Sequence, residues 1–106
     1  MSYGADLTAE QRLAVVQVSV AAHDWVFGKR RNRSRTEAVA ALQQISTDPV
    51  VLGVALGYAL ANIELDGLQA YQRLAELYRA AGADEQVATA GLAWARTQHW
   101  ASTGRR

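Results

Sequence analysis

The stretch from Pro49 to Ile63 reads PVVLGVALGYALANI and contains no charged residue. Asp48, directly before it, can cap a helix, and proline is favoured at the first helical position because its missing N–H group would have no partner there. A helix that is apolar on nearly every face is buried on all sides. With 15 residues the stretch is shorter than the ~20 that span a bilayer. It therefore predicts a buried central helix at about 49–63 and no membrane segment.

Three small residues of this stretch, Gly53, Gly57 and Ala61, are spaced four apart and so share one side of the helix. Such a side lets the backbone of a second helix come close. We expect this close helix packing within the chain, against the preceding helix at about 9–27. A seam between two copies of the chain is the alternative.

The preceding helix begins with a capping box formed by Thr8 and Gln11, and Gly28 is expected to end it in a left-handed conformation. Projected at about 100° per residue, the helix has two apolar faces. One carries Leu13, Val16, Val20 and Phe27, and the other carries Ala14, Val18, Ala22 and Trp25. A helix of this kind is either central in its own fold or shared with a partner chain.

Cap signals predict three more helices. Each begins at a side chain that can accept hydrogen bonds from the first turn, and the expected caps are Ser34 in a second capping box with Glu37, Asp66, and Asp84. The expected ends are Ser46, Gly82 and a frayed tail at 102–106.

Composition favours an all-helical fold in one domain. The chain has 106 residues, one proline and 50% hydrophobic residues. A chain of this length and composition can bury a hydrophobic core without disulfides or bound metals. We therefore predict an all-α fold, a compact orthogonal bundle of four to five helices, in a single domain at 1–106 with a basic loop at 29–35. Because cysteine is absent and no signal peptide is evident, we expect a cytoplasmic protein.

Five cations, Lys29, Arg30, Arg31, Arg33 and Arg35, lie within seven residues, whereas the rest of the chain has six Lys or Arg against ten Asp or Glu. The dipole of the first helix stabilises cations that follow it, but Arg35, at the expected start of the next helix, opposes the dipole there. The forked donors of arginine suit phosphate. The segment is thus a candidate for binding a polyanion or partner: a nucleic-acid backbone without base specificity, an acidic protein, or the acidic remainder of a second copy. Solubility alone would also explain it.

The sequence carries little that could support catalysis. His23 and His99 are the only histidines, and neither has a second histidine four residues away, as a helical metal site requires. No nucleophile elbow, phosphate-binding glycine loop or dinucleotide fingerprint occurs. We therefore expect a protein that is not an enzyme and has no metal, no cofactor and no evident small-molecule substrate.

Large amphipathic side chains near the ends of two helices indicate an interaction protein. Trp25, Arg96 and Trp100 are candidates for a partner or dimer interface, because tryptophan and arginine are enriched where proteins bind one another. We expect a small adaptor or regulatory protein that binds another macromolecule, with a protein partner or a homodimer. The alternative is a nucleic-acid-associated protein that uses the basic loop at 29–35.

Overall fold

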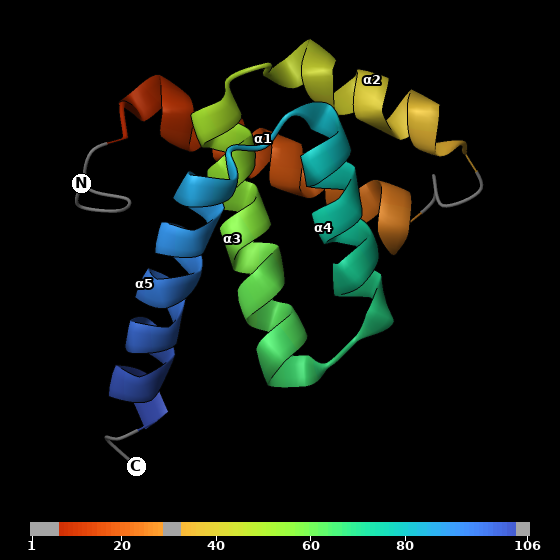
Figure 1. Ribbon diagram of the computed structural model, residues 1–106. Coiled ribbons are helices and arrows are strands. Elements are labelled where there is room, and N and C mark those ends of the chain that lie inside the picture. Colours follow the sequence, from red (N-terminus) through yellow and green to blue (C-terminus); the bar gives the residue numbers. More distant parts are fainter. Residues whose placement is uncertain (1–6, 29–32, 104–106) are drawn as a thin grey trace.

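The computed structural model describes residues 7–28 and 33–103, and for 94–96 and 98–103 it describes the backbone alone (Figure 1). Five helices follow one another along the chain. They are α1 (Ala9–Val26), α2 (Arg35–Ile45), α3 (Pro49–Asp66), α4 (Gln69–Ala81) and α5 (Glu85–Thr103). No strand occurs among the described residues, so the predicted all-α class is confirmed.

The central helix of the bundle is α3. Figure 1 shows α4 and α5 on either side of α3 and running along it, with α1 crossing behind them and α2 lying across the end where α3 begins. Within the described residues, α3 packs against α1, α4 and α5, whereas α2 packs against α1 and α4. This is the compact orthogonal bundle with a buried central helix that the sequence predicts.

The start of α3 follows the predicted capping pattern. The Asp48 carboxylate accepts from the Val50 N–H group at 2.9 Å, and Pro49 occupies the first turn. From Val51 to Gly57 every residue is buried, and Leu52 and Leu56 are inaccessible to solvent. The uncharged stretch of the sequence therefore supplies the middle of the core.

The junction between α3 and α4 differs from the prediction. α3 continues through Asp66, and Gly67 ends it with a left-handed φ of 64°. Asp66 therefore closes α3 and does not cap α4. Leu68 holds the cap position of α4 and makes no side-chain hydrogen bond there. α3 ends at this position because glycine readily adopts the left-handed conformation that terminates a helix.

The small residues of α3 face α5, not α1 as predicted. A Cβ atom on Gly53 would lie 2.8 Å from the backbone oxygen of Asp84, and one on Gly57 would lie 3.0 Å from that of Ala88. Ala61 is also buried. The turn after α4 returns the chain to the beginning of α3, where the Asp84 N–H group donates to the Pro49 oxygen at 3.0 Å. The last helix can therefore run beside α3 from its first turn.

α1 begins as predicted and ends differently. The Thr8 hydroxyl accepts from the Gln11 N–H group at 3.0 Å, and the Gln11 side chain accepts from the Thr8 N–H group at 2.9 Å. The helix ends at Val26, and Gly28 does not have a positive φ. The predicted left-handed stop is therefore wrong. A side chain at this position would instead collide with the Asp24 carboxylate.

The second predicted capping box forms only in part. The Ser34 hydroxyl accepts from the Glu37 N–H group at 3.2 Å. The Glu37 carboxylate pairs with Arg33 at 3.4 Å. The exposed guanidinium of Arg33 therefore takes the carboxylate that was expected to reach back to the cap.

Of the described helices, α3 alone is long and apolar enough to cross a membrane, and half of the apolar window is buried inside the bundle. A buried core helix has the same composition, and we interpret α3 as one.

α5 includes Ser102 and Thr103, so it extends into the tail expected at 102–106, whereas 104–106 lie outside the described residues.

Candidate interaction surface

One of the two apolar faces of α1 belongs to the core. Val18, Ala22 and Trp25 are buried among residues of the other helices. Beside them, the side chain of Ser19 makes a hydrogen bond with Tyr78 of α4. Burial raises the pKa of Tyr78 to about 12, although the hydrogen bond with Ser19 acts in the opposite direction. This face anchors α1 to the rest of the bundle.

The second apolar face of α1 is open to solvent. The exposed fractions of Leu13, Val16, Val20 and Phe27 are 58%, 58%, 65% and 44%, and Ile45 of α2 is 37% exposed. The four α1 residues are separated by three, four and seven positions, which is the spacing with which one helix packs along another. We call these five residues the outer face.

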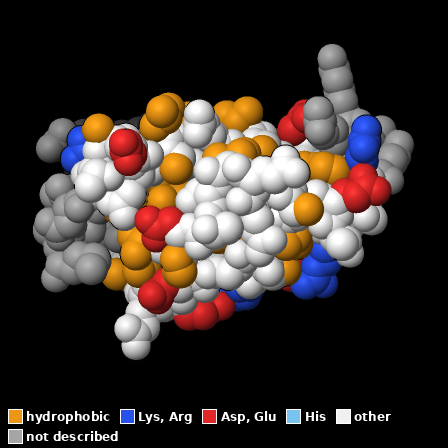
Figure 2. All heavy atoms as spheres, turned by 90° about the horizontal axis from the view of Figure 1, so that it is seen from above, with side chains coloured by type: hydrophobic (Ala, Val, Ile, Leu, Met, Phe, Trp, Pro, Cys, Tyr) orange, Lys and Arg blue, Asp and Glu red, His pale blue; other side chains and the backbone are white. Residues whose placement is uncertain are grey.

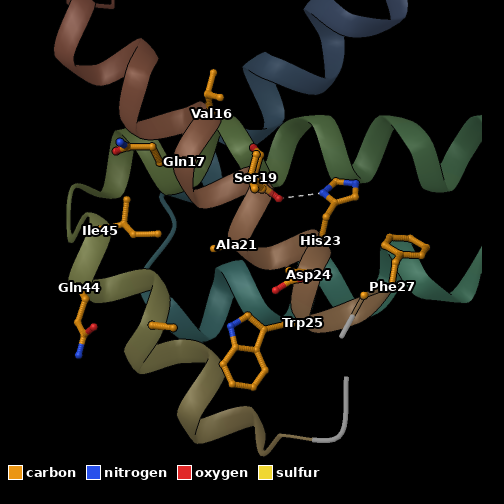
Figure 3. Close-up of a pocket in the computed structure, with 13 residues that line it drawn as sticks. Val16, Gln17, Ser19, Ala21, His23, Asp24, Trp25, Phe27, Gln44 and Ile45 are labelled. Atoms are coloured by element: carbon orange, nitrogen blue, oxygen red, sulfur yellow. Dashed lines mark hydrogen bonds between the residues drawn. The ribbon is translucent and has the colours of Figure 1, made fainter. Parts of the chain in front are cut away.

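The outer face borders a hollow of about 1130 Å³ that α1 and α2 line. Figure 3 shows Trp25 reaching from α1 toward α2, with Gln44 and Ile45 on the α2 side. Ligand pockets for small molecules usually enclose roughly 300–1,000 Å³. The volume of this hollow is close to the upper end of that range, and the hollow lies along two helices. We call it the α1/α2 groove.

Two aromatic rings hold Phe27 at the end of the outer face. Phe27 stacks on His23 with ring centroids 5.3 Å apart, and Tyr71 of α4 meets Phe27 edge-on at 5.7 Å. Nδ1 of His23 lies 2.9 Å from the backbone oxygen of Ser19 (Figure 3). These contacts position an exposed phenylalanine that could otherwise turn freely in solvent.

Polar residues border the outer face. Glu10, Gln17 and Asp24 are seven positions apart, and Gln17 and Asp24 line the groove beside α2. On a helical projection Arg12 and Ser19 follow the opposite flank. Viewed from above, on the side of α2, hydrophobic side chains are seen along the upper edge of the surface and also at its lower left and right (Figure 2). An apolar strip between polar flanks is typical of a helix that packs against another chain.

The basic segment is only partly described. Arg33 and Arg35 are both exposed, and Arg33 pairs with Glu37. Arg35 is the first residue of α2 and has no carboxylate within ion-pair distance in the described part of the chain. Lys29, Arg30 and Arg31 lie outside the described residues. The structure therefore leaves Arg35 as a cation whose position the helix dipole does not favour.

The predicted aromatic interface residues have different positions. Trp25 is 8% exposed and belongs to the core, so it reaches the candidate surface only as part of the groove lining. The side chains of Arg96 and Trp100 lie outside the described residues. Helical projection of the sequence already placed Leu13, Val16, Val20 and Phe27 on one face. It missed the contribution of Ile45 and the groove itself, because both depend on how α2 packs against α1.

The described residues contain no group of three His, Asp or Glu side chains that could hold a metal ion, and none of their charged side chains is buried. Comparison of the chain with protein-family models, with curated proteins and with solved structures found no match in any of the three.

Proposed function

We propose that this protein is a small non-enzymatic interaction protein whose working surface is the outer face of α1. Its function is to bind an apolar helix of another polypeptide chain. One observation carries the proposal: Leu13, Val16, Val20 and Phe27 are exposed at the spacing of a helix-packing seam.

The free energy available from this surface supports the proposal. Full burial of a Val, Leu, Ile or Phe side chain is worth about 1.5–3 kcal/mol relative to full exposure. The five side chains of the outer face are between 37% and 65% exposed, so covering them contributes roughly 1 kcal/mol each. Soluble monomers rarely expose a continuous apolar surface of more than about a few hundred Å² to water unless that surface binds something.

The shape of the surface favours a helix as the bound element. A helix that enters a groove uses side chains at helical spacing, which fill the space between the walls. Here α1 and α2 provide the walls, and Gln17 and Gln44 offer side-chain amides at their edges. The mode of binding is thus helix-in-groove, with affinity from apolar contacts and orientation from the polar flanks.

Photo-crosslinking tests the proposal directly. A photoreactive phenylalanine analogue replaces Val20 in one variant and Leu65 in another, since Leu65 is a similarly exposed apolar residue of α3, at 51%. In native extract treated with nuclease, position 20 is expected to give a crosslink to a polypeptide and position 65 is not. Equal labelling at the two positions would contradict the proposal.

The same experiment separates the nucleic-acid alternative. Crosslinking that disappears on nuclease treatment would favour phosphate binding by the basic loop. In that case, changing Arg30, Arg31, Arg33 and Arg35 to Glu should abolish retention on duplex DNA. Neutralising up to five phosphates predicts a log–log salt slope of at most about −4.5. Retention that the four substitutions leave unchanged would exclude this alternative.

A further inference from the structure

We infer that the chain bound at the outer face is a second copy of this protein, with the two α1 helices antiparallel across a two-fold axis near the middle of the helix. This inference rests on the proposed function and names the partner that the proposed function leaves open. Its support comes from the repeat of the apolar residues and from the charges at the two ends of the α1/α2 groove.

The apolar residues of α1 are complementary to their own reversed copy. Leu13, Val20 and Phe27 are seven positions apart, and Val16 lies between the first two. In an antiparallel pair centred near position 18, Val16 faces Val20 of the second copy, and Phe27 faces Ala9. A large ring thus meets a small, exposed residue at each end, and the valines meet at the axis. Such alternation of large and small side chains lets two identical faces interdigitate.

The charges at the ends of the groove favour the antiparallel direction. Glu10 is exposed in the first turn of α1, on the flank that faces α2 further along. Antiparallel pairing brings Glu10 of the second copy to the opposite end of the groove, where α1 ends and α2 begins. Arg35 lies at that end, exposed at the first position of α2. The second copy would therefore supply the carboxylate that Arg35 does not find in the described part of its own chain.

The other described charged groups near that end do not remove this complementarity. Arg33 is engaged with Glu37, and Asp24 already has a partner within its own chain. The positive end of the α2 dipole also favours an incoming carboxylate. Parallel pairing would instead leave Glu10 of the second copy at the end of the groove where α1 begins, away from Arg35. The antiparallel arrangement also places the two α1 dipoles side by side in opposite directions.

Light scattering with size-exclusion chromatography, together with sedimentation equilibrium, tests the self-association. The purified chain is expected to be a dimer at micromolar concentration. Val20→Glu puts two carboxylates at the axis and should weaken the dimer by at least about 100-fold. Leu65→Glu introduces the same charge on α3, outside the outer face, and should leave the dimer unchanged. A monomeric wild-type protein, or equal effects of the two substitutions, would overturn the inference.

Charge reversal tests the direction of the pairing. Glu10→Arg and Arg35→Glu should each weaken the dimer by about 3- to 10-fold, because each interrupts two symmetry-related exposed contacts. The double variant exchanges the charges and should recover most of the wild-type association. A double variant as weak as the sum of its single changes would exclude the antiparallel contact, and circular dichroism verifies that all variants keep their helical content.

These outcomes are distinguishable from a failure of the proposed function. If the purified chain is monomeric but position 20 still crosslinks to a different polypeptide in extract, the second copy is the wrong partner and the outer face remains a binding surface. If position 20 gives no more crosslinking than position 65 and Val20→Glu has no effect on association, both proposals fail.

Discussion

α3 and α1 are both 18 residues long and rich in apolar side chains, yet they use these side chains in different ways. α3 packs against α1, α4 and α5, and half of its residues are buried. α1 lies at the edge of the bundle and buries only Val18, Ala22 and Trp25. Its second apolar face stays in solvent. The comparison shows that an apolar face indicates contact with something, while the position of the helix in the fold decides whether that contact lies within the chain.

A pair of leucine-to-alanine substitutions gives the largest expected difference between the two helices. Leu56→Ala in α3 removes a fully buried side chain and should lower the free energy of unfolding by about 2–5 kcal/mol. Leu13→Ala on the outer face should change it by less than about 0.5 kcal/mol. Urea denaturation at low protein concentration measures both. Similar losses for the two variants would mean that Leu13 is buried in the folded monomer, which would remove the outer face.

The stability of the protein at alkaline pH tests the packing of the buried face of α1, the face that carries Val18, Ala22 and Trp25. Burial raises the pKa of Tyr78, which hydrogen-bonds with Ser19 beside the buried face of α1, to about 12 from its usual value of 10.0. A raised pKa favours the neutral phenol in the folded state, so this stabilisation is complete below pH ~10 and is lost as the pH rises toward ~12. The loss amounts to about 2–3 kcal/mol.

Tyr78→Phe supplies the control for this pH dependence. The variant should lose roughly 1 kcal/mol at neutral pH, because the hydrogen bond with Ser19 is removed. Between pH ~10 and ~12 its stability should fall less steeply than that of the wild type. Identical slopes in denaturation measured across this range would show that Tyr78 is not buried against α1.

Gly57→Ala has a small expected effect, and its sign is informative. Alanine is favoured over glycine in a helix by about 1 kcal/mol, but here its Cβ atom would lie 3.0 Å from the Ala88 oxygen and 3.2 Å from the Cα atom of Gly91. Both neighbours are backbone atoms of α5 that cannot turn away. We expect a net destabilisation of about 1 kcal/mol in thermal or urea unfolding. A stabilised variant would mean that α5 does not approach α3 closely at this position.

Local signals in the sequence predicted the helices well. The capping box of Thr8 and Gln11, the Asp48–Pro49 pair and the Asp84 cap each start a helix where expected. These signals work because the bonds that they make span only two or three residues. One error occurred where two local signals compete. Gly67 ended α3 with a left-handed turn and so displaced Asp66 from the expected cap.

The candidate surface could be predicted only in part. Helical projection separates the face of Val16 and Val20 from the face of Val18 and Trp25, because the period of the helix is known in advance. It cannot tell which of these faces is covered. Trp25 was therefore expected at an interface and lies in the core, whereas the groove with Ile45 required the packing of α2 against α1.

The sequence by itself determined where four of the five described helices start, which of their faces are apolar, and that the uncharged stretch at 49–63 is central. Only the tertiary structure decided that Gly53 and Gly57 receive α5 and that one apolar face of α1 stays exposed. The reason is geometric. Helix formation depends on neighbours within one turn, while burial depends on which distant helices reach a given face. α1, α4 and α5 pack against three sides of α3. α1 meets the bundle with one of its two apolar faces, and no described helix covers the other.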